Sequence, residues 1–123
     1  MARIANDRIV ESAFPRSDGS WEFLITYTVH FEPFEIGLFF NDSVKIWEED
    51  TSDDDQITAY APVETFHASG PSVFRRKRFT AQADALDTEV GKEEIYAWIW
   101  LRDANSLGPA ADEQRTPIKS IDP

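Results

Sequence analysis

The stretch that decides the fold reads Trp-Glu-Phe-Leu-Ile-Thr-Tyr-Thr-Val-His-Phe-Glu, from residue 21 to residue 32. Its large apolar side chains stand at every second position, and a two-residue period is typical of a β-strand with one buried face. A helix would spread the same aromatic side chains around its axis. We therefore expect one continuous buried face, made of Trp21, Phe23, Ile25, Tyr27, Val29 and Phe31.

Further strands are expected on both sides of this stretch. Residues 8–14 indicate a weaker strand, and the turn residues at 17–20 join it to the first strand as a hairpin. The apolar pattern resumes at residues 38–47, where the polar residues 41–43 predict a bulge or a turn. Residues 57–66 contain a proline, which favours an edge strand or an ordered loop.

The second half of the chain continues the β pattern less regularly. Residues 73–83 predict a strand with an exposed basic half, while residues 81–90 also fit a short helix. Residues 94–102 form a strand that is apolar on both faces, so its second face must be covered by the chain itself or by a partner. Residues 103–123 are expected to be an irregular tail with a last strand near 118–121.

The number and spacing of these strands predict the fold class. About six to eight strands, with turn residues every ~8–15 positions, are typical of an all-β, antiparallel β-sandwich, which we expect to be immunoglobulin-like. A length of 123 residues suits a single domain covering residues 1–123. This fold class by itself carries no function.

Composition excludes several classes of partner and site. The chain has 23 acidic residues against 12 basic ones and a net charge of -11, so we expect no nucleic-acid partner. No window is apolar enough to predict a membrane span. The absence of cysteine excludes disulfides and thiolate metal sites and favours a cytoplasmic location.

An acidic segment at residues 48–55 is the most unusual local feature. Dense carboxylates repel one another, and Ca²⁺, which prefers oxygen ligands, would relieve that repulsion. The simpler interpretation is a solvated loop with no cofactor, and a Ca²⁺ site is the alternative. The candidate metal ligands are Glu48, Asp50, Asp53, Asp54 and Asp55.

The sequence around this segment also resembles the strand and calcium loop of C2 domains. The resemblance rests on Val44-Lys45-Ile46-Trp47-Glu48-Glu49-Asp50 followed by Asp54-Asp55-Gln56-Ile57. It implies calcium binding by the acidic side chains of the loop. The chain departs from the C2 pattern at Glu48, where C2 domains usually have Asp, and at Thr58, where they have Gly.

Two further groups of residues are candidate partner-binding sites. Four consecutive cations suit an acidic protein surface or another copy of this acidic chain. Three aromatic residues share the second face of the strand at 94–102, where they suit an interface, a sugar ring or ordinary burial. The candidate partner-binding residues are Arg75, Arg76, Lys77, Arg78, Tyr96, Trp98 and Trp100.

No motif for nucleophilic, metal-dependent or phosphate chemistry is present in the sequence. We therefore expect no catalytic residues and a non-enzymatic interaction or structural module whose partner is a protein or a second copy. The alternatives are a Ca²⁺-dependent binding module that uses the acidic segment and a carbohydrate-binding module that uses the aromatic strand face.

Overall fold

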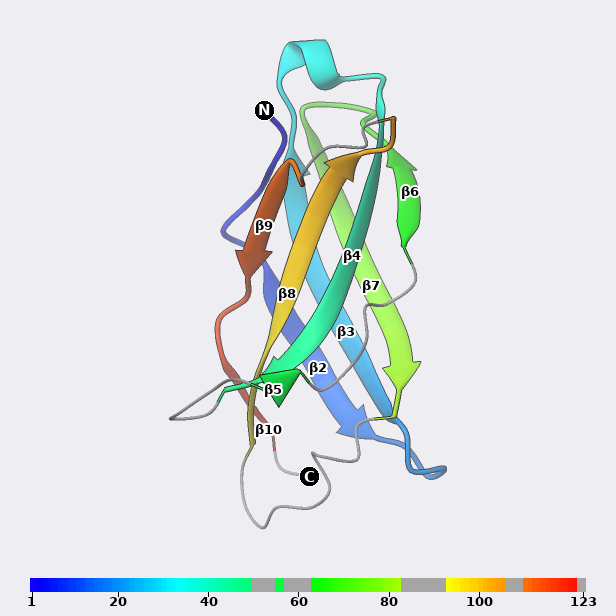
Figure 1. The fold of residues 1–123 in the computed structure, drawn as a ribbon, viewed down its shortest axis with the longest axis vertical. Helices are drawn as coiled ribbons and strands as arrows, with labels where there is room; N and C mark the ends of the chain where they lie inside the picture. Colours follow the sequence, from blue (N-terminus) through cyan, green and yellow to red (C-terminus); the bar gives the residue numbers. More distant parts are fainter. Residues whose placement is uncertain (50–54, 57–62, 83–92, 106–109, 122–123) are drawn as a thin grey trace.

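The computed structural model describes residues 1–49, 55–56, 63–82, 93–105 and 110–121, and it places two antiparallel sheets face to face (Figure 1). Sheet A contains β1 (Arg3–Ile4), β2 (Ile9–Pro15), β3 (Trp21–His30) and β7 (Ser72–Ala81). Sheet B contains β4 (Phe39–Glu48), β5 (Asp55–Gln56), β6 (Glu64–His67), β8 (Glu93–Asp103), β9 (Asp112–Arg115) and β10 (Lys119–Ile121). The predicted antiparallel β-sandwich is confirmed.

Strand β3 is the centre of sheet A. It pairs with β1 and β2 along one edge and with the whole of β7 along the other. The predicted hairpin with β2 is present, and Gly19 in its turn has a φ of 88°, a conformation that glycine adopts without strain. The strand ends before a short 3-10 helix, η1 (Pro33–Glu35), and the chain then crosses to sheet B.

Strands β4 and β8 form the centre of sheet B. They pair with each other, β9 and β10 pair with the free edge of β8, and β5 and β6 pair with the free edge of β4. In Figure 1 these strands form the nearer layer, and β6 lies beside β7 of the other sheet. This arrangement places the β6 end of sheet B over one edge of sheet A.

The core lies between the sheets and follows the predicted two-residue period. Residues 21–31 contribute the expected six side chains, all of which are buried. The inward side of β8 contributes four more buried apolar residues from the opposite sheet: Ile95, Ala97, Ile99 and Leu101. The periodicity of these two strands is therefore the main source of the sandwich core.

Two expectations about strand continuity are wrong. Strand β4 runs through residues 41–43 without a register shift against β8, although a bulge or turn was predicted there. Asp42 and Ser43 are buried in this strand, and Asp42 is neutralised by cations from β7. The tail expected from residue 103 contains the predicted last strand as β10, but β9 was not predicted, and both strands pair with β8.

Some predicted segments lie outside the described residues. They include most of the strand predicted at residues 57–66 and the helix-or-strand alternative at 81–90, which therefore stay predictions. Within the described part of the chain, no helix has the length and apolar character needed to cross a membrane.

Candidate functional site

Strand β6 lies beside β7 in Figure 1, and charged side chains from both sheets meet at this place. Sheet B supplies two carboxylates to this place, and sheet A supplies two cations and a phenol. We call this group the inter-sheet charge cluster. Its members are Tyr27, Asp42, Glu64, Arg75 and Lys77.

Strand register brings these residues together. Tyr27 of β3 stands opposite Arg75 of β7, and Asp42 of β4 stands opposite Glu64 of β6. Directly opposed residues of antiparallel strands place their side chains on the same face. Lys77 follows Arg75 by two positions on β7 and therefore shares its inward face.

Asp42 is the centre of the cluster and has no exposed side-chain surface. The Tyr27 hydroxyl donates to its Oδ2 atom at 2.6 Å, and the Arg75 Nε atom donates to the same oxygen at 2.8 Å. Arg75 Nη2 also donates to Oδ1, at 3.1 Å. The buried carboxylate is thus held by a two-point guanidinium contact, which is a strong geometry for an ion pair.

Lys77 contacts both carboxylates of the cluster. Its Nζ atom lies 2.5 Å from Asp42 Oδ1 and 2.6 Å from Glu64 Oε1, and it donates to the Asp42 main-chain oxygen at 3.2 Å. The Lys77 side chain is only 2% exposed, whereas that of Glu64 is 54% exposed. Glu64 is therefore the member of this cluster that is most exposed to solvent.

Burial and charge shift two pKa values within the cluster. Burial raises the pKa of the Tyr27 phenol, and the negative charge of Asp42 raises it further, so the hydroxyl stays protonated and donates. Burial by itself lowers the pKa of Arg75, but the hydrogen bond and the charge of Asp42 outweigh burial and raise it. Both shifts keep the donors of Asp42 in their donating forms.

The cluster balances two carboxylates against two cations, and its four ion pairs and the Tyr27–Asp42 hydrogen bond all cross between the sheets. Buried charges carry a large desolvation cost, which only close and complete pairing offsets. A partial removal would leave a buried charge without its counterion. The arrangement therefore fixes the two sheets relative to each other at one position.

The four consecutive cations predicted as one partner site are divided by the strand. Arg75 and Lys77 point into the cluster, whereas Arg76 and Arg78 are exposed on the outer side of β7. Phe74 shares that outer side and is 59% exposed. Alternation along β7 thus leaves two cations, not four, on the surface of sheet A.

The aromatic residues of β8 lie on the outer side of sheet B. Trp98 and Trp100 are half-buried and Tyr96 is 5% exposed, and Trp47 of β4 stands opposite Tyr96. We call these four residues the outer aromatic face. Lys45, Trp47, Tyr96, Trp98 and Glu113 line a shallow depression of about 390 Å³ on it.

Cationic side chains lie over the rings of this face. The Arg115 guanidinium is 3.8 Å from the ring centre of Tyr96, and Arg102 is 5.4 Å from that of Trp100. Lys45 lies 5.3 Å from the ring of Trp47. These distances are typical of cation–π contacts. Cationic side chains of the same chain therefore cover part of the second apolar face of β8.

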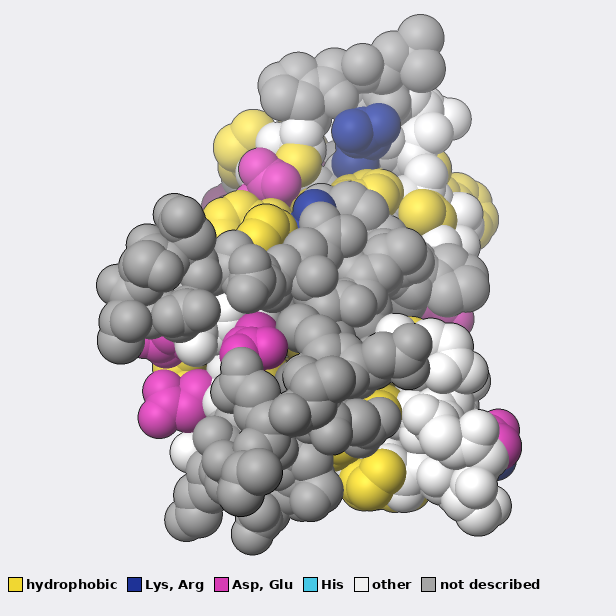
Figure 2. All heavy atoms as spheres, turned by 60° about the horizontal axis from the view of Figure 1, so that its bottom comes forward, with side chains coloured by type: hydrophobic (Ala, Val, Ile, Leu, Met, Phe, Trp, Pro, Cys, Tyr) yellow, Lys and Arg dark blue, Asp and Glu magenta, His cyan; other side chains and the backbone are white. Residues whose placement is uncertain are grey.

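The predicted metal ligands are only partly described. Glu48 is buried at the end of β4, and its backbone pairs with that of Asp55 in β5. Asp50, Asp53 and Asp54, with the side chain of Asp55, lie outside the described residues. At this end of the molecule, the described acidic side chains are scattered among other side chains (Figure 2). No group of three or more metal-ligating side chains occurs in the described part of the chain.

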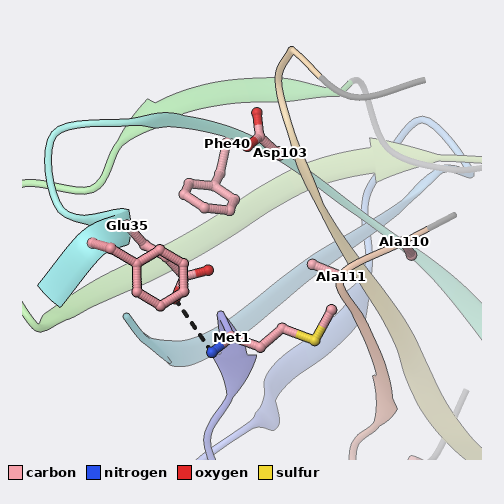
Figure 3. A pocket seen from close by; sticks show the side chains of 7 residues that line it. Met1, Glu35, Phe40, Asp103, Ala110 and Ala111 are labelled. Carbon is pink, nitrogen blue, oxygen red and sulfur yellow. Dashed lines mark ion pairs between the residues drawn. The ribbon is translucent and has the colours of Figure 1, made fainter. Parts of the chain in front are cut away.

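A second hollow, of about 450 Å³, lies at the opposite end of the sandwich, beside the N-terminus (Figure 3). Glu35 of η1 is buried there, accepts a hydrogen bond from the Ala2 main-chain N–H at 2.8 Å and lies 3.7 Å from the Met1 amino group. The carboxylate also accepts from the Glu32 N–H. Its contacts hold the N-terminal segment in place, and they indicate a structural role.

Sequence reasoning missed three members of the inter-sheet charge cluster, namely Tyr27, Asp42 and Glu64. The sequence predicts Tyr27 only as part of the buried face, and it predicts a bulge or a turn at residues 41–43, which include Asp42. A signal was available in β7, where the inward positions carry Arg75 and Lys77 between apolar residues. Buried cations need buried carboxylates, and an Asp inside an apolar strand is the natural partner.

Comparison with known proteins shows likeness in structure alone. No protein-family model matches the sequence, and no curated protein matches it. Two crystal forms of a bacterial adhesin from Mobiluncus mulieris, described as containing intramolecular disulfide, isopeptide and ester bond cross-links, resemble it with TM-scores of 0.60 and 0.55. Each match has 12% identity and covers 94% of this chain and 49% of the adhesin chain. This chain therefore spans about half the length of the adhesin chains and shares their fold.

Proposed function

We propose that this chain is a non-enzymatic β-sandwich module that binds a protein partner through the outer aromatic face, and that a second copy is the partner to test first. The observation that carries the proposal is the presence of three half-buried tryptophans on the outer side of sheet B: Trp47, Trp98 and Trp100. Tryptophan, tyrosine and arginine are the residues most enriched at the energetic centres of protein interfaces.

Charge supports a second copy as the partner. The chain carries a net charge of -11, yet the outer aromatic face is bordered by Lys45, Arg102 and Arg115. A cationic rim on an acidic protein attracts acidic surfaces, including those of another copy. The similarity in fold to the adhesin supports the general class of this proposal, a non-enzymatic interaction module.

The same contacts weigh against carbohydrate stacking. A sugar ring stacks on an open aromatic face, whereas the Arg115 guanidinium lies 3.8 Å from the Tyr96 ring. A protein partner is compatible with these cations because Arg side chains contribute to interfaces themselves. We therefore rank the protein partner above the sugar.

The test compares the solution mass and the tryptophan quenching of three chains. We expect the wild type to show a concentration-dependent mass in sedimentation, and Trp98→Ala to shift it toward the monomer. Phe74→Ala is the matched control, because Phe74 is an exposed aromatic residue on the outer side of the other sheet. It should leave the self-association unchanged.

Quenching of fluorescence separates the remaining outcomes. In the associated wild type, we expect a soluble quencher to reach the tryptophans of the outer aromatic face less well than in Trp98→Ala. A wild-type chain that stays monomeric while its tryptophans are protected from the quencher would contradict the proposal. A monomer whose tryptophans are strongly quenched would favour a small ligand or a different protein on this face.

A further inference from the structure

The Lys77 amine is buried between two carboxylates. Its Nζ atom lies 2.5 Å from Asp42 Oδ1 and 2.6 Å from Glu64 Oε1, so it contacts two carboxylates at once. Lys77 is 2% exposed and Asp42 is fully buried, and their side chains come from opposite sheets. An amine and a carboxyl group in contact at a nearly dry site are the two reactants of an amide bond.

We propose that Lys77 and Asp42 are joined by an intramolecular amide bond, which forms once the sandwich has folded and for which Glu64 carries the proton. The bond would be a covalent link between β7 of sheet A and β4 of sheet B. This bond is a covalent modification that forms once within each chain. It does not depend on the partner proposed for the outer aromatic face.

The reaction balances without a co-reactant. Glu64 accepts one proton from the Lys77 ammonium group and passes it to Oδ1 of the Asp42 carboxylate, and the neutral Nζ atom attacks the Cγ atom. The N–C bond forms, Glu64 carries a second proton from Nζ to Oδ1, and the C–Oδ1 bond breaks, so that Glu64 ends as the carboxylate it was at the start. One water molecule leaves, and neither oxidation nor reduction occurs.

The remaining members of the cluster stabilise the intermediate of this reaction. Attack on Cγ places negative charge on Asp42 Oδ2, and this oxygen already accepts hydrogen bonds from Tyr27 Oη at 2.6 Å and Arg75 Nε at 2.8 Å. Donors that are in place before reaction stabilise developing charge without reorganisation. Tyr27 and Arg75 thus form an oxyanion hole, while Oδ1, nearest to the amine, is the leaving oxygen.

Placement and burial both favour the amide over the separate ions. Two groups held in contact by a folded scaffold react as if at a very high concentration, with effective molarities of ~10⁵–10⁸ M for well-oriented pairs. The reaction converts two buried charges into one neutral amide, which removes their desolvation cost. The half-exposed Glu64 connects the site to solvent, which gives the released water a way out.

The intact mass of the denatured wild-type chain tests the proposal directly. We expect it to be lower than the mass of the sequence by one water molecule, and we expect a protease digest to contain a branched peptide that joins the segments around residues 42 and 77. Trypsin should not cleave after Lys77. If the folded and incubated protein keeps the full mass of its sequence, the proposal is overturned, because Lys77 and Asp42 then form only an ion pair.

Variants assign the roles of the individual residues. Glu64→Gln removes the proton carrier at a half-exposed position, so the folded variant should lose water at least ten-fold more slowly than the wild type. Lys119→Arg on β10 is the control and should lose water normally. Equal rates in Glu64→Gln and the wild type would overturn the role of Glu64.

Asp42→Asn provides a second, chemically distinct readout. An amide at this position would release ammonia in place of water, and its cross-linked product would have the same mass as the cross-linked wild type. Lys77→Arg, which retains a cation but cannot form this bond, should keep its full sequence mass. Loss of water from Lys77→Arg would show that another pair of residues reacts and would overturn the assignment.

Discussion

The inter-sheet charge cluster and the outer aromatic face combine the same kinds of side chain in opposite surroundings. Inside, the Arg75 guanidinium lies 4.2 Å from the ring centre of Phe66, and outside, that of Arg115 lies 3.8 Å from the ring centre of Tyr96. The inner cation has a fully buried carboxylate as its main partner. The outer cation is exposed, and it forms an ion pair with the exposed Glu49 at 3.9 Å.

This difference indicates that burial, more than residue type, decides how much each group contributes to the stability of the fold. Water and salt weaken the outer contacts, so the outer aromatic face costs little to rearrange and suits a binding surface. The inner contacts are shielded, and their loss leaves charges that nothing nearby neutralises. We therefore expect large stability effects inside and small ones outside.

A matched pair of carboxylate deletions tests most directly whether the buried contacts contribute more to stability than the exposed ones. Asp42→Ala removes both the ion pair with Arg75 and the proposed cross-link to Lys77, so two cations stay buried without a buried counterion, and we expect it to lower the free energy of unfolding by about 3–5 kcal/mol. Glu113→Ala removes an exposed carboxylate that accepts from Trp98 Nε1 at 3.3 Å, and we expect a cost below about 1 kcal/mol. Urea unfolding of both variants gives the two values, and similar values would contradict the comparison.

The second test uses pH. The folded state raises the pKa of Tyr27 above its ordinary value of 10.0, so the unfolded phenol ionises first as pH rises. Its contribution to stability is complete below pH 10.0 and is lost above it, by up to about 1.4 kcal/mol for each pH unit. Wild type and Tyr27→Phe, unfolded in urea at a series of alkaline pH values, should show this loss in the wild type alone. Parallel curves would contradict a protonated, donating phenol.

Much of the fold was predictable because periodicity is a local property. The alternation in residues 21–31 specifies a strand and its buried face whatever its partners are, and residues 94–102 gave the opposite side of the core in the same way. The short strands β9 and β10 were less predictable. Neither has a full alternating pattern, and each pairs with β8 because that strand offers a free edge.

The inter-sheet charge cluster was not predictable from any one segment. Asp42 and Lys77 are 35 residues apart in the sequence, and their contact depends on how the two sheets are stacked. Local reasoning assigns an Asp between Asn and Ser to a turn, because unpaired carboxylates avoid burial. The pairing that reverses this preference exists only after the sandwich has formed.

A smaller effect is expected from the cation–π contacts of the outer aromatic face. Arg115→Gln removes the guanidinium 3.8 Å from the Tyr96 ring and should cost about 0.5–1 kcal/mol, because the site is open to solvent. Urea unfolding measures the change, and Arg76→Gln is the control, since Arg76 is an exposed cation on the other sheet. A loss above about 3 kcal/mol would place Arg115 among shielded contacts like those of Arg75.

The smallest effect concerns the acidic segment at residues 48–55, in which six of eight residues are acidic and none is basic. Inside the sandwich each carboxylate of the cluster has a cation, whereas this segment contains no basic residue and its Glu49 pairs with an exposed cation, Arg115, at 3.9 Å. We therefore expect its carboxylates to repel one another. Repulsion between solvated charges is screened over ~10 Å at 0.1 M salt, and NaCl should raise the melting temperature by a few degrees. We expect CaCl₂ at matched ionic strength to act equally, because a solvated loop responds to ionic strength and not to the identity of the cation. A clearly larger rise with Ca²⁺, abolished in Asp53→Asn/Asp54→Asn, would instead show that these carboxylates coordinate the ion.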